Sequence, residues 1–183
     1  MKPQTTLTIA SLIALNLVMS KVAATLQLPI YMDTVGTIIG AALLPWSAVL
    51  LVGALTSILA GFVVHPAFFY YVGTQVTIAA VAVIAYRLGA FKRLWSAIPA
   101  GFLIACCAAI VSAPVTVLVF GGVTLGGTTA INAVLMAAGQ SVWKSVLGGS
   151  LIIESLDKIA ASAIAFVVLR RLPATLTAPL PAP

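Results

Sequence analysis

Three charged residues lie close together in a long apolar stretch near the C-terminus. Asp157 and Lys158 follow Glu154 by three and four residues, so all three share one face of a helix, and the order of Glu154 before Lys158 favours an ion pair. Two carboxylates and one ammonium leave a negative charge that needs a further cation in apolar surroundings. The alternative is a self-neutralised cluster that neighbouring helices hold in place.

A second group of polar residues lies just upstream and offers that cation. On one continuous helix, Asn132, Gln140 and Lys144 would form a slowly rotating stripe, with Trp143 beside it. The amides and the ammonium would bind a polar heterocycle, on which the Trp143 ring would stack. As an alternative, the stripe would merely face water along an interfacial helix.

Gln75 and Tyr70 are weaker candidates for the same pocket. Gln75 would either reach the ligand or hydrogen-bond a neighbouring helix inside a membrane. Tyr70 belongs to the aromatic segment 65–71, which is typical of a membrane-interface belt and would alternatively form a lid over a ligand.

Other kinds of chemistry find little support in the sequence. His65 is the lone histidine, which excludes a histidine-cluster metal site, and the adjacent Cys106 and Cys107 lack metal-ligand spacing. No nucleophile and base set typical of a hydrolase is present, and neither is a nucleotide-hydrolysing motif. We therefore expect a protein that is not an enzyme and that binds no metal or cofactor.

The composition indicates a membrane protein. Of the 183 residues, 62% are hydrophobic and 7% are charged, and the mean hydropathy is +1.22. Globular proteins contain about 25% charged residues, so this chain lacks the polar residues that a water-exposed surface needs. The net charge of +6 does not indicate nucleic-acid binding, because the basic residues lie at the ends of apolar stretches.

Six apolar segments are candidates for crossing the bilayer. They are residues 7–26, 34–44, 47–64, 72–85, 97–120 and 151–169. The second segment would span only about 17 Å as a helix, whereas the hydrocarbon layer is roughly 30 Å thick. It either crosses with help from the residues at its two ends, Asp33 as N-cap and Pro45, or merges with the next helix. We favour crossing, and expect an all-α, compact bundle of about six transmembrane helices over residues 1–172, followed by a Pro-rich tail at 173–183.

The basic residues predict the orientation. The short loop of residues 87–95 contains Arg87, Lys92 and Arg93, and the last span is followed by residues 170–171, both arginine, so the positive-inside rule places both groups in the cytoplasm. With six spans, the N-terminal Lys2 also obeys this rule. Segment 121–150 then lies outside, where it returns only as an interfacial or shallowly buried helix.

With these elements in place, the chain resembles the substrate-binding S components of energy-coupling factor transporters. The resemblance covers most of the chain. It rests on residues 28–37 (Leu-Pro-Ile-Tyr-Met-Asp-Thr-Val-Gly-Thr), on the Glu154-x-x-Asp157-Lys158 pattern, and on Ala10 and Ala14, which match the Ala-x-x-x-Ala pattern of the first helix in that family.

The resemblance implies a multi-pass protein of the bacterial plasma membrane, with both termini cytoplasmic. It would capture a vitamin or related micronutrient from outside, in a pocket under the outer loops among the last three helices. ATP hydrolysis in two partner ATPase subunits, coupled through a transmembrane subunit that docks on Ala10 and Ala14, would then topple it within the bilayer.

Two other hypotheses stay open at this point. In the first, the chain is a self-sufficient secondary transporter in which Glu154 or Asp157 relays protons. In the second, it is a structural membrane protein with no small ligand.

Overall fold

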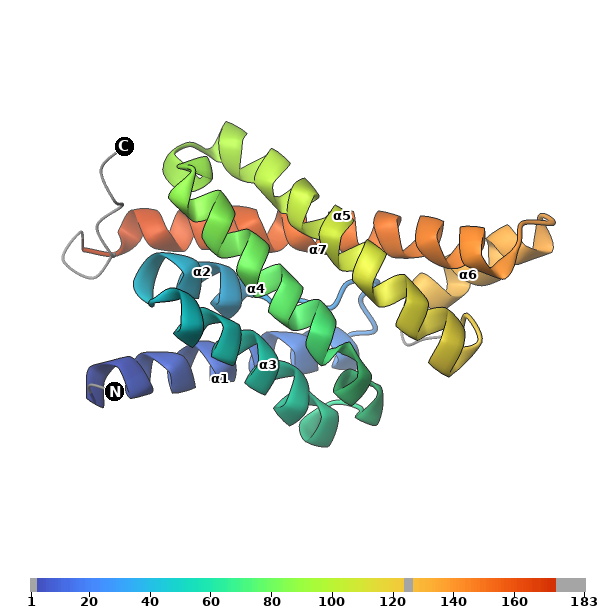
Figure 1. The fold of residues 1–183 in the computed structure, drawn as a ribbon, viewed down its shortest axis with the longest axis horizontal. Coiled ribbons are helices and arrows are strands. Elements are labelled where there is room, and N and C mark those ends of the chain that lie inside the picture. Colours follow the sequence, from blue (N-terminus) through green and yellow to red (C-terminus); the bar gives the residue numbers. More distant parts are fainter. Residues whose placement is uncertain (1–2, 124–126, 174–183) are drawn as a thin grey trace.

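The computed structural model describes residues 3–123 and 127–173, which form helices and connectors without a strand. The α-helices are α1 (Pro3–Thr25), α2 (Val35–Leu43), α3 (Trp46–Val63), α4 (Val72–Arg87), α5 (Leu94–Phe120), α6 (Gly127–Ala137) and α7 (Val142–Arg171), and the 3-10 helices are η1 (Pro66–Tyr71) and η2 (Ala90–Lys92). They form one compact bundle, which confirms the predicted all-α fold (Figure 1).

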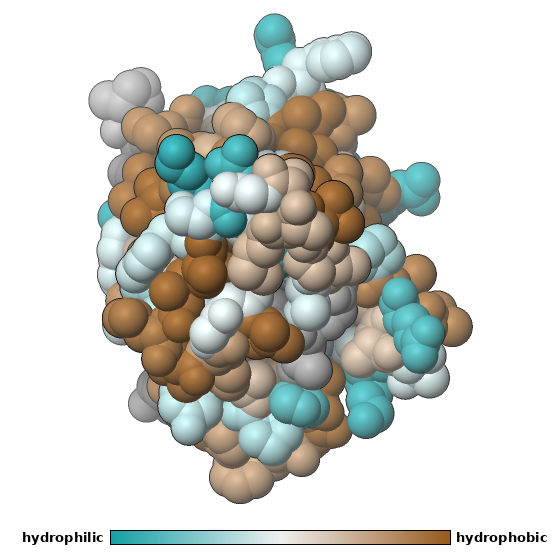
Figure 2. All heavy atoms as spheres, turned by 90° about the vertical axis from the view of Figure 1, so that its right-hand side faces the viewer, coloured by the Kyte–Doolittle hydropathy of each residue, from teal (hydrophilic) through white to brown (hydrophobic). Residues whose placement is uncertain are grey.

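Four helical stretches of the described residues are long and apolar enough to cross a membrane. They are Pro3–Thr25, Trp46–Val63, Pro66–Arg87 and Leu94–Phe120. α7 is longer still, with 30 residues, but carries charged residues at its centre, and these are buried inside the bundle. Apolar residues dominate the face in Figure 2, with hydrophilic side chains in small separate groups. The chain is therefore a multi-pass membrane protein.

The start of the first helix, the end of the last helix and most basic residues lie at one end of the bundle. α1 begins, α7 ends and η2 lies at this end (Figure 1). We call it the basic end; its basic residues are Arg87, Lys92, Arg93, Arg170 and Arg171. The guanidinium of Arg87 lies 5.5 Å from the Trp46 ring centre, and that of Arg170 lies 5.2 Å from the Phe166 ring centre. The grouping agrees with the positive-inside pattern, and the side of the membrane that it faces stays a prediction.

α2 is a half-helix enclosed by protein. Residues 35–42 are all buried, and α2 packs against α1, α3, α4 and α7. The connector, residues 26–34, is irregular, and α2 leads from it back toward the basic end (Figure 1). Residues 26–29 of the connector are exposed and residues 32–34 are buried, so its second half lies inside the bundle, where protein surrounds the irregular backbone. The extended backbone at Leu44 and Pro45 separates α2 from α3, so the two do not merge.

One buried amide joins the first three helices. The side chain of Asn16 in α1 donates hydrogen bonds to the hydroxyls of Thr37 in α2 (2.9 Å) and Thr56 in α3 (3.0 Å). Its oxygen accepts a hydrogen bond from the Gly36 N–H at 2.6 Å. All hydrogen-bonding groups of this amide are thus satisfied where no water reaches them, which fixes the start of α2 against α1.

α5 and α7 approach each other closely because small side chains line their contact. The buried small residues of these two helices include Ala97, Ala100, Gly101, Ala105, Ala108, Ala109, Ser112 and Ala113 of α5, and Ala161, Ser162 and Ala165 of α7. A Cβ on Gly101 would lie 2.7 Å from the Lys158 carbonyl oxygen. This close approach places the charged turn of α7 against the N-terminal third of α5.

The predicted continuous helix through Asn132 and Lys144 is wrong. α6 ends at Ala137, Gly139 adopts a left-handed φ of +83°, and α7 begins at Val142, so the last helix starts well before the predicted residue 151. The Ser141 hydroxyl caps α7 by accepting a hydrogen bond from the Lys144 N–H at 3.4 Å. Glycine after one helix and serine before the next are typical stop and start residues, and they break the predicted stripe.

Candidate functional site

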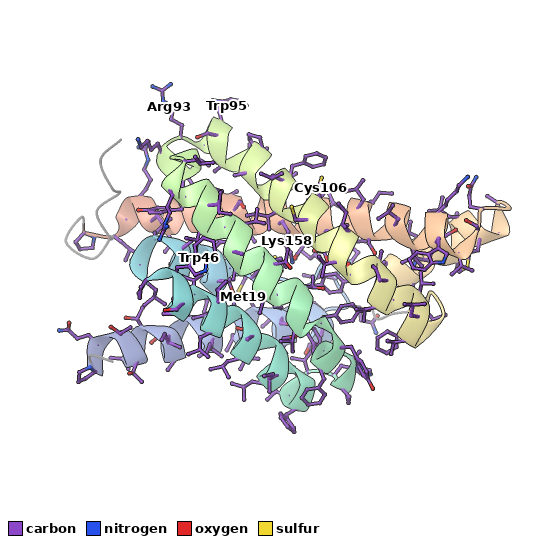
Figure 3. All side chains as sticks on the ribbon, viewed as in Figure 1. Met19, Trp46, Arg93, Trp95, Cys106 and Lys158 are labelled. Carbon is purple, nitrogen blue, oxygen red and sulfur yellow. The ribbon has the colours of Figure 1, made fainter. Side chains whose placement is uncertain are left out.

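All three acidic residues of the chain lie around one buried lysine. The Lys158 ammonium is 3.4 Å from the Asp33 carboxylate and 3.2 Å from that of Glu154, and it donates a hydrogen bond to Asp157. Lys158 is 1% exposed and Asp157 is fully buried. Figure 3 shows Lys158 in the middle of the bundle. The ion pair predicted from the Glu154–Lys158 spacing is confirmed.

Asp33 joins this cluster instead of capping α2. The N-cap of α2 is Thr34, and its side chain makes no capping hydrogen bond, so the predicted role of Asp33 is wrong. The second carboxylate oxygen of Asp33 accepts a hydrogen bond from the Gln75 amide at 2.5 Å. One signal was present in the sequence: Asp33 is the only acidic residue outside α7, and a lone carboxylate between apolar segments needs a cation.

Asp157 holds the connector in place. One of its carboxylate oxygens accepts hydrogen bonds from the backbone N–H groups of Tyr31 (3.2 Å) and Met32 (2.7 Å), and the other accepts from Lys158. Met32 has a φ of +54°, which is rare for a residue with a side chain. The carboxylate therefore compensates a strained backbone and fixes the connector against α7.

A cavity of about 800 Å³ lies beside the cluster. Its walls come from the C-terminal part of α1, the connector, η1, the first turns of α4, the last turns of α5 and the middle of α7, all away from the basic end. The polar lining includes Ser20, Gln27, Asp33, His65, Thr74, Gln75, Ser112, Thr116, Thr128, Ser150, Glu154 and Lys158. This volume falls within the range of about 300–1,000 Å³ that small-molecule sites occupy.

Three polar atoms of the cavity lining have no hydrogen-bond partner among the described residues. They are the Thr74 hydroxyl, the Gln75 carbonyl oxygen and one carboxylate oxygen of Glu154. The Gln75 oxygen must point away from Asp33, because only the NH₂ group can donate to that carboxylate. The Glu154 oxygen is within ion-pair distance of Lys158 but does not meet hydrogen-bond geometry. Buried acceptors left open in this way favour a bound donor.

Further buried polar atoms without a partner in the described part of the chain lie away from this cavity. They belong to Thr34, Asn132, Ser145 and Ser162. None of these residues lines the cavity, so the clustering of open acceptors at Thr74, Gln75 and Glu154 is a local property of that site.

Aromatic rings form the walls of the cavity. Tyr31, Phe68, Tyr71 and Phe120 contribute to its lining. The rings of Tyr71 and Phe120 are stacked, with centres 6.0 Å apart and planes at 14°. The Tyr31 hydroxyl hydrogen-bonds that of Thr128 at 2.6 Å. Fixed rings of this kind suit a flat ligand.

The structure brings some of the predicted site residues to the cavity. Gln75, Glu154 and Lys158 line it, and Asp157 lies behind them. Tyr70 is 56% exposed and contacts Phe120 edge to face at 5.4 Å, outside the cavity lining.

The remaining predicted residues lie elsewhere. Asn132 is buried between α6 and α7, where its amide donates to the Gly122 carbonyl at 3.0 Å. Gln140, Trp143 and Lys144 are exposed around the α6–α7 turn, and none of them lines the cavity. Lys144 has no ion-pair partner in residues 3–123 and 127–173, so the cation predicted for the acidic cluster is not found there.

The acidic cluster differs from a metal centre. Three carboxylates would suit a hard cation, but the Lys158 ammonium occupies the position between them. Over the described ranges, His, Cys, Asp and Glu side chains form no group of three or more that is arranged to hold a metal ion. The chemistry of this site is therefore that of ion pairs and hydrogen bonds.

Comparisons with known proteins identify no family for this chain. No protein-family model matches the chain, and neither a curated protein nor a solved structure matches it significantly. What the arrangement can do follows from its own parts: an aromatic cavity of small-molecule size, open hydrogen-bond acceptors on α4 and α7, and a buried group of three carboxylates around one ammonium.

Proposed function

We propose that this chain is the substrate-binding membrane subunit of an energy-coupling factor type importer, and that it captures a small, vitamin-like heterocycle. The observation that carries this proposal is the cavity, in which Thr74, Gln75 and Glu154 offer polar atoms without partners beside aromatic walls. A structural protein gains nothing from open buried acceptors, whereas a ligand that satisfies them gains affinity.

The proposed subunit works by binding alone. The solute enters from the end opposite the basic end, which the positive-inside rule assigns to the outside. A transmembrane coupling subunit and two ATPase subunits then move the loaded chain as a body. The exposure of Ala10 and Ala14 on one face of α1 supports docking there, because small residues allow helices to approach closely.

A second candidate function is proton-coupled transport by this chain without partners. The observation that favours it is the buried excess of carboxylates over ammonium groups, since such groups form proton relays in transporters. In that case the purified protein takes up solute into proteoliposomes under a pH gradient. A binding subunit does not, because it needs its ATPase partners.

The first test is mass spectrometry of small molecules released by denaturing the detergent-purified protein. We expect a near-stoichiometric heterocycle, and expect Thr74→Val to reduce its amount because the open hydroxyl is lost. Thr77→Val is the matched control: Thr77 lies on the same helix, bonds the Gly73 carbonyl and does not line the cavity. An empty wild-type protein, with no thermal shift across a vitamin panel, would refute the binding function.

A further inference from the structure

The cavity has an excess of negative charge that no described cation balances. Asp33, Glu154 and Asp157 surround one ammonium, that of Lys158. Burying uncompensated charge is expensive, so this site favours a further positive partner, and a proton on one carboxyl neutralises the charge that still remains.

Two nearby basic groups do not supply that partner. His65 lines the cavity, but its Nδ1 accepts a hydrogen bond from the Ala67 N–H at 3.2 Å, which requires the unprotonated nitrogen. Lys21 is exposed and donates to the Val63 carbonyl at 3.3 Å. Neither side chain forms an ion pair with the carboxylates.

Glu154 has fewer partners than the other two carboxylates. Asp157 is occupied by two backbone N–H groups and Lys158, and Asp33 by Gln75 and Lys158. Among the described residues Glu154 forms an ion pair with Lys158 alone, at 3.2 Å, and the oxygen that does so makes no hydrogen bond although its side chain lines the cavity. The open Gln75 oxygen is also an acceptor, so the ligand must donate hydrogen bonds to both.

From this geometry we infer that the cavity takes a flat cationic ligand, an aromatic ring bearing a positively charged N–H group, with Glu154 as its counter-ion. The inference rests on the proposed binding function and names its substrate class. The rings of Tyr31, Tyr71 and Phe120 support it, because the faces of aromatic rings attract cations as well as other flat rings.

The test compares three flat probes of one size on the full-length purified protein: benzamidine (cationic), benzamide (neutral) and benzoate (anionic). Calorimetric titration is expected to show benzamidine binding at least about tenfold more tightly than benzamide, since charge-assisted hydrogen bonds are the stronger kind. Glu154→Gln should remove most of this preference, whereas Thr77→Val should leave the affinities for both benzamidine and benzamide unchanged.

Each outcome has a distinct meaning. Equal or tighter binding of benzamide or benzoate to the wild-type protein would overturn the charge assignment and leave the binding function standing. Failure of all three probes to bind at millimolar concentration, together with an empty purified protein, would overturn both the charge assignment and the binding function. If Glu154→Gln fails to fold, the comparison of the three probes on the wild-type protein still decides the charge of the ligand. The net charge of a molecule that copurifies with the protein decides it independently.

Discussion

Replacing Gly101 by alanine tests whether the close approach of α5 and α7 holds the charged cluster together. A Cβ there would lie 2.7 Å from the Lys158 carbonyl oxygen, 2.9 Å from the Ile159 Cα and 2.9 Å from the Ser162 hydroxyl. Two of these three atoms are backbone, so the helices must separate. Overpacking of this kind costs about 2–3 kcal/mol, and the better helix propensity of alanine returns about 1 kcal/mol. The net loss is roughly 1–2 kcal/mol.

Thermal unfolding of the detergent-purified variants measures this loss. For a chain of this size, 1 kcal/mol corresponds to about 2–4 °C in Tm, so Gly101→Ala should melt roughly 2–8 °C below the wild type. Gly73→Ala is the matched control, because Gly73 also lies in a helix and nothing lies within 4 Å of the added Cβ. Adding Ser162→Gly to Gly101→Ala should not restore Tm, since the backbone contacts remain.

Equal stability of Gly101→Ala and Gly73→Ala would contradict this expectation. That result would mean that α5 and α7 can move apart freely, and that their small residues do not set the position of the Lys158 turn. A full rescue by Ser162→Gly would instead assign the cost to one hydroxyl and remove the backbone argument.

Three other perturbations test the cluster, the proposed docking face and the orientation. Asp157→Asn should lower the free energy of unfolding by about 3–5 kcal/mol, and by more than Glu154→Gln, because Asp157 also holds the connector; equal losses in the same melting assay would contradict this. Ala10→Leu and Ala14→Leu should preserve ligand binding and stop uptake in cells that contain the partner subunits, and normal uptake would contradict the docking face. Trp95→Cys, in a background without the native cysteines, should react with an impermeant thiol reagent in inverted vesicles and stay unlabelled in intact cells; labelling in intact cells would reverse the orientation.

Local patterns predicted the parts of the site that depend on one helix. The Glu154–Lys158 ion pair follows from a spacing of four residues, and the apolar segments follow from composition. Asp33 reaches the same lysine across 125 residues of sequence. No periodicity in a single sequence encodes a contact of that range, because it depends on how the connector enters the bundle.

The stripe of Asn132, Gln140 and Lys144 was wrong for a different reason. The sequence contains a helix stop at Gly139 and a helix start at Ser141, and these local signals override the polar spacing. The break sends Asn132 into the α6–α7 contact and leaves Lys144 exposed. Polar spacing therefore predicts a shared helix face only where no such stop and start lies between the residues.

The hold of Asp157 on the connector also sets an order of events during biogenesis. The ribosome synthesises Tyr31, whose N–H is the donor, and reaches Asp157, which carries the acceptor, 126 residues later. At about 5–20 residues per second, roughly 6–25 s pass between the synthesis of the two groups. Throughout that interval the connector must stay hydrated or be shielded from lipid by the insertion machinery, because an unpaired amide is not tolerated in lipid. The connector thus reaches its final hydrogen bonds only when the last helix arrives.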